Sequence, residues 1–299
     1  MNVRLFALSM AMLLVAPVHA QEAKGQPVDI ITPHITDSHE LETPFGSIHL
    51  PRWEPVQIGG LTVDLSPTKH VVMLTIAATL CLLLLIPAGV ANAKRASGQH
   101  ASKGWAGTIE AIVLYLRNEV ILPNVGPHGD AYVPFALTLF FFILFANLLG
   151  LIPYGSTATG NISVTATLAI ITFLVVEGAS IKALGWRYIW TIVFVPPKDM
   201  PMLLKPVMIA IMTPVELVSK FTKPFALAIR LFANMTAGHI VLLALISLIF
   251  TFGKWLIVPG PVALGIAINM LELFVAFLQA FIFTLLASVF IGLGRAEAH

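Results

Sequence analysis

Residues 225–250 read FALAIRLFANMTAGHIVLLALISLIF, an apolar stretch at helical spacing that contains one arginine, Arg230. A charged side chain at the middle of a bilayer costs between about 3 and more than about 10 kcal/mol, depending on how far it reaches water. An arginine near a helix end can avoid this cost by extending to the membrane surface, which would be a purely structural explanation. A steeply tilted helix weakens that explanation, because most of its length stays at a similar depth. Arg230 is therefore predicted to have a functional role.

The helix that carries Arg230 is too long for an ordinary membrane span. It is expected from about residue 216 to residue 252, which gives roughly 55 Å at 1.5 Å per residue. A second helix, expected over residues 261–293, would be roughly 50 Å long. The hydrocarbon core is only about 30 Å thick and an average tilt is about 20°. Both helices are therefore expected to be steeply tilted.

The composition of the whole chain is that of a membrane protein. Of its 299 residues, 58% are hydrophobic and 11% are charged, whereas a soluble domain has roughly 25% charged residues. The net charge of +2, without any run of basic residues, gives no indication of a nucleic-acid partner. The single cysteine, Cys81, excludes an intrachain disulfide.

Three shorter spans and one surface helix complete the predicted fold. Residues 71–93 form an apolar stretch without charges that is long enough to cross the membrane. Residues 105–122 have apolar positions at helical spacing with interspersed charges, which favours an amphipathic helix on the membrane surface. Residues 132–152 and 162–179 predict two further crossings. The predicted fold is all-α, with about five membrane-embedded helices and one surface helix.

Two segments precede the membrane domain, which is expected over residues 70–299. Residues 1–20 combine Arg4, an apolar run and a small-residue cleavage pattern, which is typical of a secretory signal peptide. An uncleaved membrane anchor is the alternative. Residues 21–69 are polar and rich in proline, which predicts an extended arm with short strands.

Basic residues predict the orientation of the chain. Lys94, Arg95 and Lys103 follow the first span closely, which indicates that this end lies in the cytoplasm. The arm of residues 21–69 is then exported, in agreement with the predicted signal peptide. Continuing through the five predicted helices places the C-terminus in the cytoplasm.

Four polar residues on the two long helices are further candidate site residues beside Arg230. Asn234 lies one turn further along the same face, and His239 is a side chain suited to proton relay. Glu272 and Gln279 are seven residues apart and project from one face of the last helix. An intramembrane glutamate needs a partner, so His239 is the natural candidate if the two helices pack antiparallel. Considered alone, His239 would more often be a satisfied buried histidine.

Three other polar residues lie in apolar surroundings: Glu216, Asn147 and Glu177. Asn147 and Glu177 are possible channel-lining residues. Glu216 has Lys220 four residues further on, so a surface ion pair competes with a functional role.

The sequence has no phosphate-binding loop, no dinucleotide-binding glycine motif, no metal-spaced Cys/His set and no nucleophile elbow. Neither ATP hydrolysis nor covalent catalysis is therefore expected of this chain, and no cofactor or metal is implied. Proton or ion handling is the chemistry that remains.

Four motifs together resemble subunit a of F-type ATP synthases. They are KPFALAIRLFANMTAGH at residues 223–239, ELFVAFLQAFIFTLL at 272–286, FANLLGLIPY at 145–154 and TPVELVSKFTKP at 213–224. The resemblance covers residues 70–295 and leaves out the arm and the signal peptide. It implies a non-catalytic stator subunit of the Fo sector in the bacterial inner membrane, with two proton half-channels. The implied partners are a ring of c subunits and the b subunits.

The resemblance also implies roles for individual residues. The family's essential arginine falls on Arg230, which would keep each passing c-subunit carboxylate ionised and block a leak between the half-channels. The family's asparagine falls on Asn234 and its glutamine on Gln279. His239 and Glu272 take the acid and histidine positions of the outer half-channel in swapped order. Glu216 matches a position of the inner half-channel, and Gly150 stands where some members carry a second polar residue.

Other function classes explain less of the sequence. A stand-alone secondary cation transporter would be expected to show internal repeats and broken helices, which are not found. A membrane assembly protein would leave Arg230, His239 and Glu272 without a role. A sodium-coupled version of the same subunit stays open, because ion choice in this family depends chiefly on the c-ring.

Overall fold

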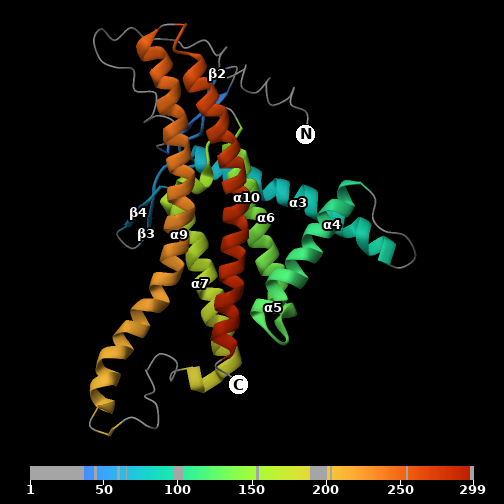
Figure 1. Cartoon of the computed structure of the whole chain (residues 1–299), viewed down its shortest axis with the longest axis vertical. Coiled ribbons are helices and arrows are strands. Elements are labelled where there is room, and N and C mark those ends of the chain that lie inside the picture. Colours follow the sequence, from blue (N-terminus) through green and yellow to red (C-terminus); the bar gives the residue numbers. More distant parts are fainter. Residues whose placement is uncertain are drawn as a thin grey trace. The chain divides into compact units, whose positions relative to one another are not determined.

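The computed structural model describes residues 37–43, 46–58, 61–64, 66–96, 104–152, 155–188, 201–202, 204–253 and 255–296. The predicted signal peptide and residues 21–36 of the arm lie outside these ranges. Within them, five helices are long and apolar enough to cross a membrane (Figure 1). The predicted all-α class with five membrane helices is confirmed.

Helices α3 (Lys69–Ala96), α6 (Val133–Gly150) and α7 (Ile162–Leu184) correspond to the three shorter spans. Their bounds differ from the predicted ones by a few residues. In α3 the helix continues through Pro87. Its Leu82 and Leu83 are 59% and 63% exposed, as expected for side chains that face lipid rather than a protein core.

Helices α9 (Lys205–Phe252) and α10 (Pro259–Ala296) are the two long ones, with 48 and 38 residues. Helix α9 begins earlier than the predicted start near residue 216, because it continues through Pro214 and Pro224. Proline removes one backbone hydrogen bond, but membrane helices tolerate it where neighbouring groups satisfy the freed carbonyl. The steep tilt of both helices stays a prediction.

The segment predicted as a surface helix forms consecutive helical pieces. These are α4 (Trp105–Tyr115), a π-helical turn (Leu116–Ile121) and α5 (Leu122–Val125). Three short 3-10 turns follow along the chain, at Gly129–Tyr132, Ala158–Gly160 and Gly185–Tyr188. The helical nature of residues 105–122 is confirmed, and their position on the membrane surface stays a prediction.

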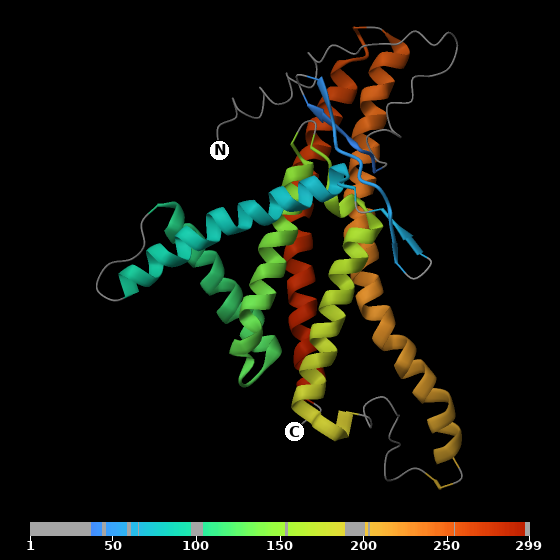
Figure 2. The same cartoon turned by 180° about the vertical axis from the view of Figure 1, so that it is seen from behind.

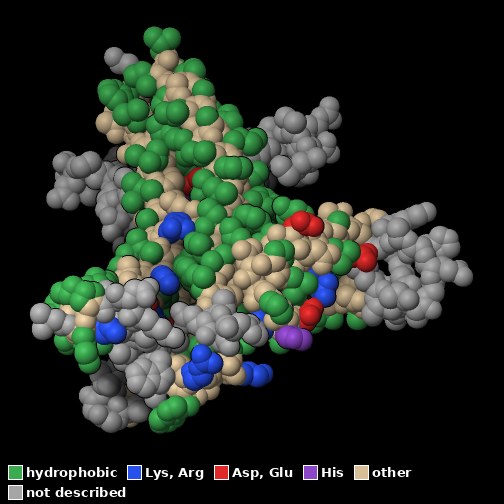
Figure 3. Space-filling view, turned by 60° about the horizontal axis from the view of Figure 1, so that its bottom comes forward, with side chains coloured by type: hydrophobic (Ala, Val, Ile, Leu, Met, Phe, Trp, Pro, Cys, Tyr) green, Lys and Arg blue, Asp and Glu red, His purple; other side chains and the backbone are tan. Residues whose placement is uncertain are grey.

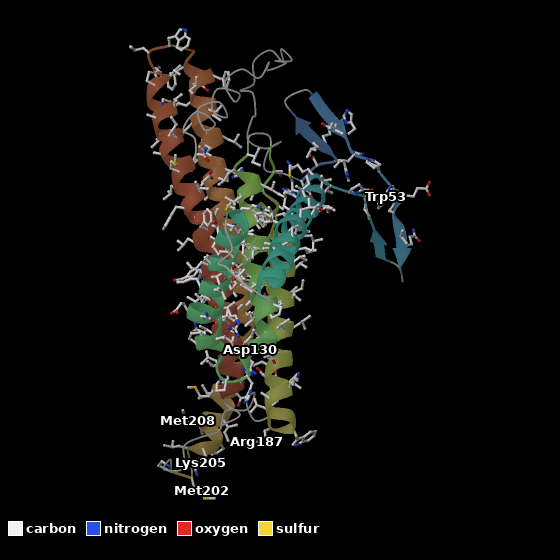
Figure 4. The ribbon with its side chains drawn as sticks, turned by 90° about the vertical axis from the view of Figure 1, so that its right-hand side faces the viewer. Trp53, Asp130, Arg187, Met202, Lys205 and Met208 are labelled. Atoms are coloured by element: carbon white, nitrogen blue, oxygen red, sulfur yellow. The ribbon has the colours of Figure 1, made fainter. Side chains whose placement is uncertain are left out.

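The short strands predicted in the arm are confirmed as two hairpins. Strand β1 (Glu40–Thr43) pairs antiparallel with β2 (Gly46–His49), and β3 (Val56–Ile58) pairs antiparallel with β4 (Leu61–Val63). Trp53 lies between the two hairpins and is 59% exposed (Figure 4).

The chain divides into two compact units, each of which contains segments distant in sequence. The first comprises Met1–Leu82, Phe142–Asn161 and Phe232–Leu278, and the second comprises Leu83–Phe141, Ile162–Leu231 and Gln279–His299. Within the first unit, the C-terminal half of α9 runs beside the N-terminal half of α10 (Figures 1 and 2). Within the second, the C-terminal half of α10 runs beside α7.

Small side chains allow α10 to approach its neighbours closely. Ala280, Ala287 and Ser288 are completely buried. At Gly292 and Gly294 an added Cβ would overlap the Asn124 carbonyl and the Ser180 hydroxyl, respectively. Small residues at such contacts are how membrane helices pack, because lipid provides no hydrophobic drive for helix association.

Apolar side chains also cover the outside of the long helices. Leu174 of α7, Phe225 of α9 and Phe274 of α10 are each more than 60% exposed. Hydrophobic side chains dominate much of the face in Figure 3. A surface of this kind is suited to lipid or to another membrane protein.

We expect the substitution Ala287→Leu to lower the folding stability of the chain by about 1–3 kcal/mol, because the buried site has no room for the larger side chain. The midpoint of thermal unfolding in detergent is the measurement. Ala267→Leu is the matched control, since Ala267 is exposed on the same helix. An equal shift in both variants would contradict this account of α10 packing.

Candidate functional site

His239 and Glu272 lie together in the first unit, one on each long helix. His239 Nδ1 is 3.7 Å from Glu272 Oε1, and the Glu272 side chain is only 7% exposed. The structure therefore brings together the two residues that the sequence suggested as partners. A carboxylate this deeply buried is costly unless a charge or a proton compensates it, so the pair is suited to proton exchange.

The other ring nitrogen of His239 fixes the orientation of the imidazole. Nε2 lies 3.0 Å from the Gly150 carbonyl oxygen and 3.0 Å from Thr157 Oγ1. A carbonyl can only accept, so Nε2 carries a proton when it bonds to Gly150. Nδ1 then faces Glu272 and is the nitrogen that gains or loses a proton.

Two glycines make this arrangement sterically possible. An added Cβ at Gly238 would overlap the carboxyl group of Glu272, and one at Gly150 would overlap the hydroxyl of Thr157. Glu272 thus lies against bare backbone of α9. Gly150 replaces a possible polar side chain with close packing and a carbonyl acceptor.

Asn147 is completely buried on α6 and takes part in a hydrogen-bonded network. Its Oδ1 accepts a hydrogen bond of 2.7 Å from Thr159, and its Nδ2 donates to the Ala276 carbonyl at 3.4 Å. These bonds join α6, the loop before α7 and α10. Asn147 does not line either of the two cavities described below.

A small cavity lies beside His239 in the same unit. Its volume of about 20 Å³ is enough for roughly one water molecule. Hydroxyl groups of Ser156, Thr157 and Thr236 are among its lining residues, and His70 of α3 lines it too. Among the described residues, Thr236 Oγ1 and both Glu272 carboxyl oxygens are buried without a hydrogen-bond partner. Buried polar groups of this kind are normally satisfied by water.

The second unit contains a larger cavity of about 340 Å³ between α7, α9 and α10. Polar and charged residues from the first two helices line it: Thr172, Glu177, Ser180, Glu216, Ser219 and Lys220. Two acids predicted as functional, Glu177 and Glu216, therefore face the same space. The volume can hold several water molecules.

Lys220 finds a partner on another helix. Its Nζ lies 3.6 Å from Glu177 Oε2 and 4.6 Å from the ring centroid of Tyr188, whose hydroxyl donates to Glu177. Sequence reasoning considered only the neighbour four residues away, Glu216. Glu216 is exposed at the cavity.

Arg230 is exposed on α9, although Leu227 and Leu231 nearby on the same helix are buried. Asn234 is exposed one turn further along, whereas Gln279 of α10 is only 5% exposed. Among the described residues Arg230 makes no ion pair. A permanently charged guanidinium in an apolar helix needs water or an opposite charge beside it.

Neither cavity is a metal site by composition. Across the ranges that the structure describes, no three His, Cys, Asp or Glu side chains are grouped so that they could hold a metal ion. The chemistry that these residues offer is the binding and release of protons.

We expect Gly238→Ala to push Glu272 away from His239 and to lower folding stability by about 1–3 kcal/mol, because the new methyl group occupies the position of the carboxyl group. The midpoint of thermal unfolding in detergent is again the measurement. Gly265→Ala is the control, because a Cβ there makes only an ordinary contact of 3.9 Å with Leu242 across the same two helices. If the two variants were equally stable, the close approach at Gly238 would not constrain the pair.

Comparison with known proteins assigns the chain to a family. The family of the ATP synthase A chain matches residues 71–292. ATP synthase subunit a of Chloroherpeton thalassium is 48% identical, over 89% of this chain and 78% of that protein. Subunit a 2 of Chlorobium luteolum is 45% identical over 94% and 80%, and subunit a of Anaeromyxobacter dehalogenans is 42% identical over 87% and 68%.

The matched residues include α6, α7 and α9 completely, α3 except its first two residues, and α10 almost to its end. Both His239 and Glu272, and the exposed Arg230, therefore lie within the shared region. The chain belongs to the ATP synthase A chain family, the non-catalytic, multi-pass subunits a of the proton-translocating Fo sector of bacterial F-type ATP synthases.

Proposed function

We propose that this chain lines two separate proton half-channels and that Arg230 stands between them, facing the carboxylates of a rotating c-ring. The observation that carries the proposal is the exposed position of Arg230 on α9, a predominantly apolar helix. Its exposed neighbours one turn away are small or polar, namely Ala226, Ala233 and Asn234. Small residues allow another membrane helix to approach closely, and the guanidinium supplies a fixed positive charge that would attract a buried carboxylate there.

Arg230 acts as a fixed charge and not as a proton carrier. A carboxylate in lipid favours its neutral form, and a cation a few ångströms away restores the ionised form. Each rotor carboxylate therefore loses its proton on reaching Arg230 and regains one beyond it. Asn234 lies one turn away and can hydrogen-bond to the guanidinium or to water beside it.

The outer half-channel is formed around His239 and Glu272. A proton held on Nδ1 of His239 can pass to the Glu272 carboxylate. Gln279 lies two turns further along α10 on the same side as Glu272, and offers the next polar group toward the rotor. Asn147 supports the site from α6 through its bond to Thr159, and its role as a channel-lining residue stays a prediction.

The inner half-channel is the 340 Å³ cavity of the second unit. Glu216 offers an exposed carboxylate to that cavity. Glu177 is paired with Lys220 and Tyr188, so its carboxylate offsets the positive charge of Lys220 at the cavity wall. The two half-channels thus use different residues.

The arm is exported and the C-terminus is cytoplasmic in this proposal. Arg187 and Lys205 lie toward the same end of the second unit (Figure 4), and Lys182 lies in the last turn of α7. Clusters of basic residues favour the cytoplasmic side of a bacterial inner membrane. Subunits c and b of the same Fo sector are the expected partners. Sodium coupling stays open, because the ion-binding carboxylate belongs to the ring.

We expect Arg230→Ala to abolish proton-coupled ATP synthesis by the assembled enzyme, because no fixed cation would then ionise the rotor carboxylates. Arg230→Lys should retain little of it, since the pKa of a lysine falls on burial whereas arginine stays charged. ATP synthesis in energised membrane vesicles is the measurement. Phe225→Leu, at another exposed position of the same helix, is the control for assembly. Full coupling in the alanine variant would refute the proposed role.

His239 and Glu272 are expected to act as one unit. The double substitution His239→Ala with Glu272→Ala should therefore reduce proton flux by less than the product of the two single effects. Flux through the Fo sector in liposomes, driven by a potassium diffusion potential, is measured for the four members of the cycle. Strict multiplicativity of the single effects would show that the contact at 3.7 Å has no role in transfer.

A further inference from the structure

A second histidine–carboxylate pair lies at the start of α3, outside the residues used so far. His70 Nδ1 lies 2.9 Å from Asp37 Oδ1, with side chains that are 4% and 33% exposed. A buried histidine paired with a partly exposed carboxylate combines a protected proton-binding group with a contact to solvent. Asp37 belongs to the arm and His70 to the first turn of a membrane helix.

Backbone and side-chain bonds hold the arm on the start of α3. The Lys69 amide donates to the Ser38 carbonyl at 2.9 Å, next to Asp37, and His39 Nδ1 lies 3.2 Å from the Pro67 carbonyl. The Trp53 amide donates to Ser66 Oγ at 2.9 Å. The position of Asp37 is therefore set by several contacts of the arm residues that follow it in sequence.

Asn161 extends this cluster toward α7. Its Nδ2 donates to Asp37 Oδ2 at 3.4 Å and lies 3.3 Å from His70 Nδ1. The Asp37 carboxylate thus receives contacts from two directions, which orders both of its oxygens. With Nδ1 of His70 bonded to the carboxylate, Nε2 is the ring nitrogen that is able to exchange a proton.

The small cavity of the first unit connects His70 to His239. Both histidines line it, together with the hydroxyl-bearing Ser156, Thr157 and Thr236. Thr157 Oγ1 is also 3.0 Å from His239 Nε2. A space that holds roughly one water, surrounded by hydroxyl groups, is sufficient for proton transfer between the two rings.

We propose that Asp37 and His70 form the outer entrance of the half-channel, so that the arm takes a direct part in proton uptake. This inference rests on the proposed function of His239 and Glu272. Asp37 attracts a proton from the outer solution, and His70 holds it as an imidazolium stabilised by the Asp37 carboxylate. The proton then crosses the cavity to Nε2 of a His239 ring that holds its own proton on Nδ1. Nδ1 passes that proton to Glu272, and the Nε2–H that has formed donates to the Gly150 carbonyl. Only N–H and O–H bonds form and break.

Charged groups near His70 act on its protonation in opposite directions. Lys69 precedes it and is 6% exposed, so its positive charge lies close to the imidazole. Among the described residues, Asp37 and Lys69 are the charged groups that act on His70. His239 lines the same cavity, and His39 of the arm bonds to the Pro67 carbonyl nearby. Asn161 is polar but does not titrate. The Asp37 carboxylate is therefore the group whose negative charge stabilises a protonated His70 at the membrane surface.

The synthase is assembled completely and its catalytic sector is then removed. The remaining membrane sector is reconstituted in liposomes, and protons are driven inward from the arm side. His70→Asn keeps a donor for Asp37 but cannot relay a proton, so flux should fall about tenfold or more. Asp37→Asn should lower flux and shift its pH profile to lower pH, because His70 would then bind protons less well. With His70→Ala, imidazole added on the arm side should restore part of the flux.

The arm offers a matched control pair. His49 Nδ1 lies 3.2 Å from Glu40 Oε1 on β1 and β2, but both side chains are more than half exposed and neither lines the cavity. His49→Asn and Glu40→Gln should leave flux and its pH profile unchanged. Flux in His70→Asn equal to that of His49→Asn would overturn the inference.

Loss of flux without rescue by imidazole in His70→Ala would also overturn it, since a merely structural role predicts that result. If the His70→Asn variant does not assemble, the Asp37→Asn variant is the test. A pH profile of flux equal to that of the unchanged protein would overturn the inference. The Arg230 and Glu272 variants separate this inference from the proposed function. If these variants lose coupling while the His70 variants keep normal flux, the inference about the entrance is overturned and the proposed half-channels stand. If the Arg230 variants keep normal coupling, both the inference and the proposed function are overturned.

Discussion

The close approach of Glu272 to the backbone of α9 is the constraint on which the outer site depends. A carboxyl group that is 7% exposed in an apolar helix can persist only if another group compensates it. Here the compensation comes from the histidine next to Gly238, and the glycine creates the space in which the two meet. The imidazole is in turn fixed by the Gly150 carbonyl. The contact between His239 and Glu272 and the two glycines beside it therefore determine how α6, α9 and α10 fit together in the first unit.

Polar residues in these helices fall into two groups with different physical behaviour. Asn147 and Thr159 are completely buried and satisfy each other, which makes them part of the packing. Thr236 and Glu272 are buried with polar atoms that find no hydrogen-bond partner among the described residues. Satisfied networks stabilise one arrangement, whereas incomplete ones are where water and protons are handled. The division separates supporting residues from residues that exchange protons, although both kinds look alike in the sequence.

Sequence reasoning identified the charged residues well and the close contacts poorly. Arg230, His239 and Glu272 stand out because each is costly in an apolar helix, so composition and spacing alone single them out. The roles of Gly150 and Gly238 depend on which side chain lies opposite, and no local pattern carries that information. Lys220 pairs with Glu177 of another helix, although Glu216 is the neighbour that helical spacing suggests. The start of α9 was missed because the local effect of proline was weighted above the packing that overrides it.

Helix α9 carries both of its interior prolines, Pro214 and Pro224, in the half that precedes Arg230. Each interior proline has no backbone N–H, so one hydrogen bond of the helix is not formed. This half therefore bends more easily than the half that carries His239. In the proposed function a c-ring turns against this helix, and that contact would place a sideways load on it. The softer half can absorb that load elastically, while the stiffer half keeps the proton-exchanging side chains in register. The uneven placement of two prolines thus gives a single helix a flexible segment and a rigid one.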